Sequence, residues 1–214
     1  MKINIYGSTG EIGKKTLFLI NKYFPKLNVN LLCANSNVNL INKQIDIFKP
    51  KYVYLSNKKA SEKLKSIIKS KSKSKSKVLS FAELCNYLKI SQSDFSILAI
   101  SGYKALYFLE HIINNTKNLG LVNKEAIVSA GHIFKKKKYF KKTNIFPIDS
   151  EHFSLFEFFN KINTKTKIKK IILTASGGPF YKKKFYSLKN IKFQQAIKHP
   201  KWKMGYKNSI DSAT

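Results

Sequence analysis

The chain has 214 residues, of which 41 are basic and 11 acidic, so its formal net charge is +30. Hydrophobic residues make up 43% of the sequence and aromatic residues 13%. That is enough apolar surface to form a core, and it excludes a wholly disordered chain despite the charge. The length suits one large domain or two small ones.

All of the basic residues are lysine, and arginine is absent. Proteins that read nucleic acid rely on arginine for bidentate contacts to guanine and phosphate. We therefore expect no specific nucleic-acid partner. So many ammonium groups still predict non-specific binding to polyanions at low salt.

Cys33 and Cys85 are the only cysteines, and they lie far apart in the sequence. They indicate neither a disulfide framework nor a zinc site, which is typical of a reducing compartment. The first residues lead directly into an apolar strand pattern and leave no room for a signal peptide. No apolar run has the length of a membrane span. We expect a cytoplasmic protein with no membrane partner.

Short β-like runs alternate with helical patterns through the first part of the chain. This alternation predicts an α/β fold with a doubly wound parallel sheet and crossover helices. The expected strands cover residues 3–6, 29–33, 52–55, 96–100 and 119–122. The expected helices cover residues 12–21, 38–48, 60–68 and 104–114.

The lysine-serine alternation at 69–77 has no apolar residue and predicts a solvated loop before a short strand at 77–79. A lysine cluster at 135–138 is typical of a charged helix end and connector. Beyond it we expect a strand at 144–148, an aromatic-rich helix at 153–159 and a further strand at 170–175. A domain boundary near Ile148 would divide the chain into residues 1–148 and 149–214.

Three glycines, Gly7, Gly10 and Gly13, lie between the first expected strand and the first expected helix. Glycines there permit a tight turn and a close approach of backbone to a pyrophosphate, which the N–H groups of the helix terminus attract. Their spacing is GxxGxxG rather than GxGxxG, and a purely structural turn is the alternative. The position within a βαβ unit favours a dinucleotide site.

The second strand is followed by Asn35, Ser36 and Asn37. NAD-specific sites usually place a carboxylate here to hold the ribose 2′-hydroxyl. An uncharged turn would not repel a 2′-phosphate, so the sequence favours NADPH over NADH. Without arginine, binding of that phosphate would depend on Ser36, Asn37 and nearby lysines.

A cluster of polar residues, Asp149-Ser150-Glu151-His152, follows the strand at 144–148. Two carboxylates separated by one residue can converge on a hard cation such as Mg²⁺ or Mn²⁺. The alternative is that Asp149 or Ser150 is a helix N-cap followed by a first-turn acid.

Several motifs occur in the order found in the 1-deoxy-D-xylulose 5-phosphate reductoisomerase family. They are residues 7–13, 121–125 (LVNKE), 147–152 (PIDSEH), 174–180 (TASGGPF), 198–205 (KHPKWKMG) and 209–214 (SIDSAT). Because the motifs span the whole chain, the sequence resembles that family throughout. The resemblance implies a Rossmann-like NADPH-binding domain at 1–148, followed at 149–214 by the beginning of an α+β catalytic domain.

The resemblance also implies a function. It predicts the rearrangement of the phosphosugar 1-deoxy-D-xylulose 5-phosphate to an aldehyde, which NADPH then reduces to 2-C-methyl-D-erythritol 4-phosphate in non-mevalonate isoprenoid biosynthesis. In the family a divalent metal, Mg²⁺ or Mn²⁺, chelates substrate oxygens as a Lewis acid. The family enzymes are homodimers.

The residue roles that the resemblance implies fall into five groups. The metal ligands would be Asp149 and Glu151. The catalytic residues would be Lys124 together with these two carboxylates. Substrate would be held by Lys124, Ser150, Glu151, Ser176, His199 and Ser212. Trp202 and Met204 would belong to a flap that excludes water. The residues lining the cofactor would be Gly7, Thr9, Gly10, Glu11, Ile12, Asn35, Ser36, Asn37, Asn123, Glu125 and Gly205.

The chain departs from the family pattern in three places. Glu11 replaces a serine, and Asn35–Asn37 replaces a Gly-Lys-Asn-like turn. The family also continues past the position of Thr214 into a Met-Met-Asn-Lys-Gly-Leu-Glu segment that carries the third carboxylate ligand. We therefore expect the 214-residue chain alone to have little or no activity. The alternatives are an inactive remnant that only binds nucleotide and a non-specific, lysine-rich polyanion binder.

Overall fold

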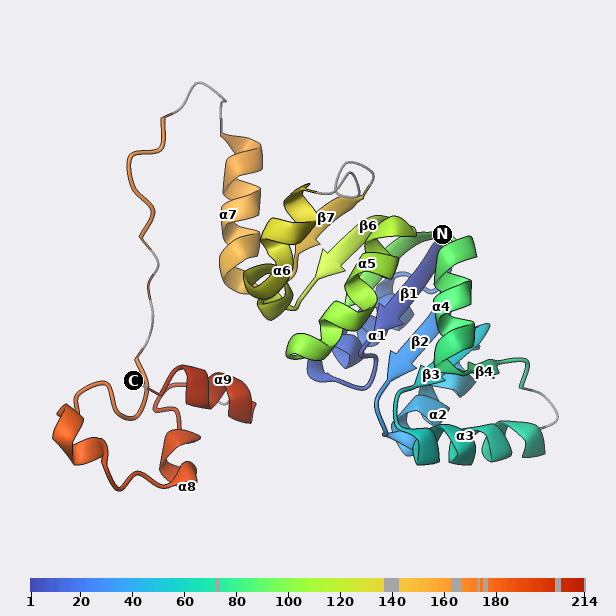
Figure 1. Cartoon of the computed structure of the whole chain (residues 1–214), viewed down its shortest axis with the longest axis horizontal. Helices are drawn as coiled ribbons and strands as arrows, with labels where there is room; N and C mark the ends of the chain where they lie inside the picture. Colours follow the sequence, from blue (N-terminus) through green and yellow to red (C-terminus); the bar gives the residue numbers. More distant parts are fainter. Residues whose placement is uncertain are drawn as a thin grey trace. The chain divides into compact units, whose positions relative to one another are not determined.

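The computed structural model describes residues 1–71, 74–136, 143–162, 167–172, 174, 177–202 and 205–213 (Figure 1). The chain divides into two compact units, Met1–Ile162 and Asn163–Thr214, and each is described by itself. In the described part no helix is both long enough and apolar enough to cross a membrane.

The first unit is built on a seven-stranded sheet in the order β4-β3-β2-β1-β5-β6-β7. Every neighbouring pair of strands is parallel. All strands therefore end at the same edge of the sheet, and the chain reverses its direction of winding between β1 and β5. The strands are β1 (Lys2–Tyr6), β2 (Asn28–Ala34), β3 (Tyr52–Leu55), β4 (Lys77–Leu79), β5 (Ser93–Leu98), β6 (Thr116–Leu121) and β7 (Asn144–Pro147).

Helices cover both faces of this sheet (Figure 1). One buried cluster joins the strands to α1 (Glu11–Tyr23), α2 (Val38–Phe48) and α3 (Lys58–Ser70). The other joins them to α4 (Phe81–Ile90), α5 (Leu106–Asn114), which follows the short turn η1 (Tyr103–Ala105), and α6 (Lys124–Lys136). Because successive side chains of a strand point to opposite faces, Ile5 belongs to the first cluster and Tyr6 to the second. The predicted doubly wound α/β fold is confirmed.

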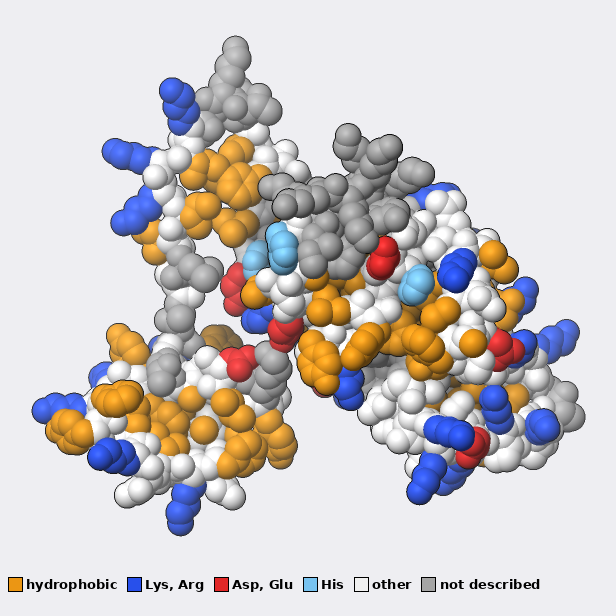
Figure 2. All heavy atoms as spheres, viewed as in Figure 1, with side chains coloured by type: hydrophobic (Ala, Val, Ile, Leu, Met, Phe, Trp, Pro, Cys, Tyr) orange, Lys and Arg blue, Asp and Glu red, His pale blue; other side chains and the backbone are white. Residues whose placement is uncertain are grey.

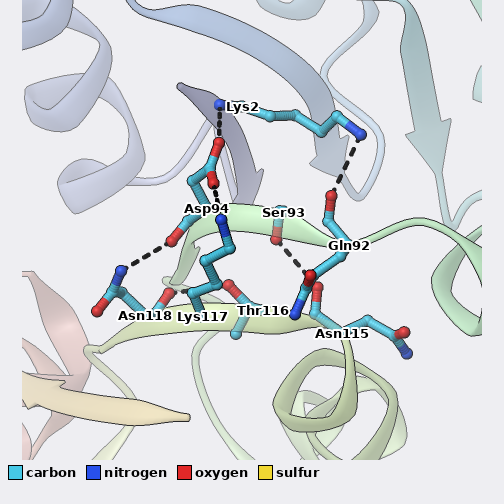
Figure 3. A network of polar contacts seen from close by, with 8 residues as sticks. All are labelled: Lys2, Gln92, Ser93, Asp94, Asn115, Thr116, Lys117 and Asn118. Carbon is cyan, nitrogen blue, oxygen red and sulfur yellow. Dashed lines mark hydrogen bonds and ion pairs between the residues drawn. The ribbon is translucent and has the colours of Figure 1, made fainter. Parts of the chain in front are cut away.

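A polar network joins the amino ends of three central strands (Figure 3). Asp94 at the start of β5 accepts a hydrogen bond from the Lys2 backbone N–H at 2.8 Å and pairs with the Lys117 ammonium at 2.8 Å. Asn118 of β6 donates to the Asp94 carbonyl at 3.0 Å. The hydrogen bond from Lys117 is the main cause that lowers the pKa of Asp94, so its carboxylate is ionised at neutral pH. The network fixes the register of these strands at the amino edge of the sheet, opposite to the edge formed by their carboxyl ends.

The helix α7 (Ser150–Lys161) follows β7 and confirms the predicted aromatic-rich helix. Phe146 of β7 packs edge-on against Phe156 of α7, with ring centroids 5.7 Å apart. This contact explains why α7 belongs to the first unit, which ends at Ile162. The domain boundary near Ile148 stays a prediction.

The strand expected at 170–175 is a wrong prediction for the residues that the structure describes. Residues 170–172 and 174 are in no strand, and Ile171 and Ile172 are 55% and 72% exposed. Their apolar side chains resemble a strand pattern, but a strand needs a neighbouring strand for its backbone hydrogen bonds. The described part of the second unit instead forms η3 (Phe185–Leu188), α8 (Phe193–Ala196) and α9 (Tyr206–Asp211).

Helix α4 is an element that the sequence prediction missed, and its start carries a clear signal. Ser80 accepts a hydrogen bond from the Glu83 backbone N–H at 3.2 Å, and Glu83 accepts one from the Ser80 N–H at 2.8 Å. This is a capping box, which satisfies two backbone donors at the helix start. Glu83 also pairs with Lys77 at 2.7 Å.

The hydrogen bond from Lys77, with those from Ser80, lowers the pKa of Glu83 to about 2. Since the folded pKa lies below the ordinary value of 4.5, the charge stabilises the fold above about pH 4.5 and this contribution is lost as the pH falls toward 2. We expect Glu83→Gln, which keeps the cap, to lower the free energy of unfolding by about 0.5 kcal/mol at pH 7, because solvent screens the pair. Urea unfolding should show the difference vanish between pH 4.5 and 2. A constant difference over that range would contradict the assignment, and Glu62→Gln on α3 is the control.

Candidate functional site

The glycine turn between β1 and α1 is held against the ends of two strands. The backbone N–H groups of Gly7 and Ser8 donate to the Cys33 carbonyl at the end of β2, at 2.8 and 2.9 Å. Gly7 has a φ of +89°, and a Cβ there would overlap the Ala99 carbonyl that follows β5. A side chain is therefore excluded, because the turn lies against backbone at the point where the sheet reverses its winding.

Gly13 is the second position in this turn where only glycine fits. A Cβ on Gly13 would overlap the Gly7 carbonyl oxygen and the backbone of Ser8. The first turn of α1 thus packs directly on the loop that leads into it. The N-cap residue Gly10 supplies no side-chain hydrogen bond, so no side chain occupies the cap position at this helix terminus.

Two other features of the turn bear on an anionic ligand. The carboxylate of Glu11 pairs with Lys14 at 3.2 Å on the exposed surface of α1. The Ser8 hydroxyl is buried and has no hydrogen-bond partner in the part of the chain that the structure describes. A buried polar group without a partner is rare in a native fold, so Ser8 suits a ligand that completes the turn.

The loop after β2 lies next to the loop after β3. The Asn57 backbone N–H donates to the Asn35 carbonyl at 3.0 Å, and the Ser56 hydroxyl donates to the Asn35 side chain at 2.8 Å. Asn37 is the N-cap of α2, where its side chain accepts from the Leu40 N–H at 3.0 Å. An open pocket of about 390 Å³ borders these loops, and Ser36 and Asn37 are among its lining residues.

The residues after β6 also lie at this edge. Asn123 is buried, donates to the Gly102 carbonyl at 2.8 Å and caps α6 by accepting from the Ala126 N–H at 2.6 Å. Lys124 is the exposed first residue of α6, and Glu125 follows it. The hydrogen bonds of Asn123 hold the start of α6 in place. That Asn123 and Glu125 contact the cofactor, and Lys124 the substrate, stays a prediction.

Asp149 and Glu151 follow β7 at the same edge of the sheet. Asp149 is the N-cap of α7, and its Oδ1 accepts from the His152 backbone N–H at 2.9 Å and lies 2.7 Å from the His152 ring Nδ1. Ser150 donates to Glu151 at 2.9 Å. Asp149 is thus a helix N-cap, as the alternative to a metal site proposed. The cap uses Oδ1, so the second carboxylate oxygen of Asp149 can still bind a metal.

Partial burial raises the pKa of Asp149, but the hydrogen bonds from His152 outweigh it and the net pKa lies below its ordinary value. Asp149 is therefore ionised at neutral pH. In the described residues no group of three or more potential metal-binding side chains occurs. The donor set here is a pair of carboxylates, which suits a hard cation that keeps several waters.

The remaining predicted residues belong to the second unit. His199 Nδ1 accepts from the backbone N–H groups of Lys201 and Trp202 at 3.2 and 3.1 Å, so the ring proton lies on Nε2 in this arrangement. Trp202 is 61% exposed, and Gly205 is the N-cap of α9. Ser176 and Met204 lie outside the described residues.

Ser212 lies against Gly178 in the second unit. The Phe180 N–H donates to the Ala213 carbonyl at 2.8 Å. A Cβ on Gly178 would overlap the Ser212 carbonyl oxygen and the backbone of Ala213. Gly178 and Ser212, which the sequence separates by more than thirty residues, are thus in direct contact.

A doubly wound parallel sheet with a glycine turn at its switch point defines a Rossmann-like protein of the dinucleotide-binding class. Two family models match the chain. They are "1-deoxy-D-xylulose 5-phosphate reductoisomerase" over residues 3–131 and the C-terminal domain of that enzyme over residues 145–214. The chain belongs to the 1-deoxy-D-xylulose 5-phosphate reductoisomerase family.

Relatives named 1-deoxy-D-xylulose 5-phosphate reductoisomerase match the whole chain. The protein from Thermodesulfovibrio yellowstonii is 42% identical over 214 residues, which are 100% of this chain and 55% of the relative. The protein from Wigglesworthia glossinidia brevipalpis is 41% identical over 223 residues, 100% of this chain and 56% of the relative. The chain therefore spans about half the length of these relatives.

Solved structures of the enzyme show the same fold. The reductoisomerase from Zymomonas mobilis in complex with NADPH has a TM-score of 0.81 and 28% identity, and the match covers 99% of this chain and 54% of that one. A reductoisomerase in complex with NADPH, fosmidomycin and magnesium has a TM-score of 0.82 and 27% identity, and the match covers 100% of this chain and 54% of that one.

Proposed function

We propose that the chain carries the NADPH-binding unit and two metal-binding carboxylates of a 1-deoxy-D-xylulose 5-phosphate reductoisomerase. The observation that carries the proposal is the convergence of four predicted segments at one edge of the sheet. They are the glycine turn after β1, the polar loop after β2, the start of α6 after β6 and the acidic pair after β7. Ligands of doubly wound sheets bind outside the carboxyl ends of the strands.

The residues at this edge fit the cofactor. Gly7 and Gly13 leave a backbone surface that a Cβ would fill, and Ser8 offers a buried hydroxyl that lacks a partner in the described structure. The pyrophosphate of NADPH would lie against the start of α1, where the helix dipole favours negative charge. Glu11 does not oppose this, since its carboxylate pairs with Lys14 on the exposed surface.

Asp149 and Glu151 fit a divalent cation, Mg²⁺ or Mn²⁺. When bound, the metal would polarise the substrate oxygens, and NADPH would supply the hydride. Lys124, at the start of α6, would bring a positive charge to the same edge and attract an anionic phosphosugar. Ser150, whose hydroxyl donates to Glu151, would orient that carboxylate.

In this proposal the phosphosugar also meets Ser176, His199 and Ser212 of the second unit, and Trp202 and Met204 form a flap over it. Nε2 of His199 carries a proton in the observed arrangement and can donate to a phosphate oxygen. A cytoplasmic location and assembly into a homodimer complete the proposal.

The experiment that tests the proposal is a fluorescence titration of the 214-residue chain with NADPH. We expect saturable binding of one NADPH per chain at physiological salt. Salmon-sperm DNA should bind at low salt and dissociate as the salt is raised, because its contacts are electrostatic.

The distribution of lysines agrees with non-specific binding of DNA. In the space-filling view, lysines are scattered over the visible surface of both units and do not gather into one stripe (Figure 2). Absence of NADPH binding, with DNA binding retained at physiological salt, would favour the polyanion binder instead.

A further inference from the structure

We propose that Lys59 and Lys63 of α3 hold the 2′-phosphate of NADPH and give the chain its preference for NADPH over NADH. This inference rests on the proposed function, because it assigns new residues to that cofactor site. It concerns the pocket of about 390 Å³ that borders the loops after β2 and β3. Ser36, Asn37, Asn57, Lys59 and Lys63 are among its lining residues.

The sheet brings these residues together. β2 and β3 are parallel neighbours, and Ala34 pairs with Leu55 at their carboxyl ends. The Ser56 N–H donates to the Ala34 carbonyl at 3.1 Å and the Asn57 N–H to the Asn35 carbonyl at 3.0 Å. The start of α3 is therefore fixed beside the loop that follows β2, which in dinucleotide-binding folds meets the adenosine ribose.

Charge at the pocket is of one sign. Both lysines are exposed, and neither forms an ion pair in the described part of the chain. Among the described residues, no aspartate or glutamate lines the pocket. A phosphomonoester carries a charge of about −1.5 to −2 at pH 7, so it would be the only anion at this site.

The arrangement is unfavourable for the helix without a ligand. Residues four apart lie one above the other on a helix, and like charges at these positions destabilise it. A lysine in the first turn also opposes the helix dipole. The first turn of α3 contains no acidic residue, and Glu62 in its second turn pairs with neither lysine in the described part of the chain. A phosphate between the two ammonium groups reverses both effects, since it pairs with both lysines and lies at the positive end of the helix.

Lysine is common in this chain, so the position of the two residues carries the inference rather than their type. Lys58 is the neighbouring residue in the same first turn and is also exposed, but it is not among the residues that line the pocket. It is therefore a matched control of the same charge on the exposed surface of the same helix.

The test is a titration of the 214-residue chain and its variants with NADPH and with NADH, followed by nicotinamide fluorescence at two salt concentrations. We expect the unsubstituted chain to bind NADPH more tightly than NADH, and the advantage to shrink at high salt. The double variant Lys59→Gln/Lys63→Gln should bind NADPH about tenfold more weakly, equivalent to about 1.4 kcal/mol, and should bind NADH unchanged. Its thermal midpoint without ligand should equal or exceed that of the unsubstituted chain.

The outcomes separate the inference from the proposed function. If the double variant keeps the full preference for NADPH, or if Lys58→Gln reduces it equally, the assignment of these two lysines is overturned and NADPH binding stands. If the unsubstituted chain binds NADPH and NADH equally, no 2′-phosphate site exists and the inference is also overturned. If it binds neither, the proposed function fails together with the inference.

Discussion

Alanine at position 13 is expected to lower the free energy of unfolding of the first unit by about 3 kcal/mol and to abolish NADPH binding. The added Cβ would overlap the Gly7 carbonyl oxygen and the Ser8 backbone. These atoms cannot move aside cheaply, because the N–H groups of Gly7 and Ser8 are bonded to the Cys33 carbonyl at the end of β2. Either α1 moves away from the sheet or the glycine turn opens. Both changes remove the surface on which a pyrophosphate would lie.

Urea unfolding and NADPH titration of Gly13→Ala measure the two effects. The matched control is Gly131→Ala in α6, where the new Cβ would lie 3.3 Å from the exposed Ile127 side chain, which can move aside, and would meet no other side chain in the described part of the chain. Alanine favours a helix over glycine by about 1 kcal/mol, so this control should be at least as stable as the unsubstituted chain and bind NADPH normally. A Gly13→Ala chain with ordinary stability and NADPH affinity would show that the turn does not bind the cofactor.

Replacement of Asp149 by Asn is expected to weaken Mn²⁺ binding by about tenfold or more, since even partners outside the ligand shell contribute 10- to 100-fold to metal affinity. The stability of the chain should change little. Asn caps a helix about as well as Asp, so the hydrogen bond from the His152 N–H survives while the charged ligand is lost. Asp149→Ala, in contrast, should also lower the free energy of unfolding by about 1 kcal/mol.

Binding of Mn²⁺ is measured by the loss of the electron paramagnetic resonance signal of the free ion. Glu157→Gln is the matched control, because Glu157 lies on the same helix and pairs with Lys161 at 3.2 Å, away from the cap. We expect Glu151→Gln to behave like Asp149→Asn, and Glu157→Gln to bind Mn²⁺ as the unsubstituted chain does. Equal Mn²⁺ affinity in all four proteins would mean that the acidic pair is a helix start and nothing more.

The fold was largely predictable because its central strands β1, β2 and β3 are buried on both faces. Apolar runs such as 29–33 and 52–55 fall within or coincide with β2 and β3, and the helix at 38–48 matches α2. The strand predicted at 96–100 lies too far along the chain, since β5 covers Ser93–Leu98. Its last two residues are apolar, but the Ala99 carbonyl forms the surface against which Gly7 packs. A tertiary contact, and not hydrophobicity, ends that strand.

Other errors have local causes. Helix α4 is absent from the sequence prediction, which rests on hydrophobic periodicity. Ser80 and Glu83 have the spacing of a capping box, a signal of a helix start that periodicity does not contain. The apolar residues at 171–172 suggested a strand because periodicity cannot tell whether a partner strand is present. Pairing is a property of the folded sheet and not of the segment.

Part of the candidate site could likewise be predicted from the sequence, and part follows only from the structure. The glycine turn, the loop after β2 and the acidic pair could each be found from residue types placed after expected strands. That Asp149 uses one oxygen to cap α7 follows only from the geometry. The sequence also indicated that nearby lysines would hold a 2′-phosphate without naming them. Lys59 and Lys63 emerge because β3 lies beside β2, which places the start of α3 next to Ser36 and Asn37.

The measurement that tests the central claim most directly is hydrogen–deuterium exchange of the 214-residue chain with and without NADPH. The claim is that the cofactor lies across the carboxyl edge of the first unit. We expect NADPH to slow exchange in peptides that contain the glycine turn at 7–13, the loop at 35–37 and the start of α3. Exchange at the opposite edge, around Asp94 and Lys117, should be unaffected. Protection centred on any other part of the chain, or no protection at saturating NADPH, would contradict the account.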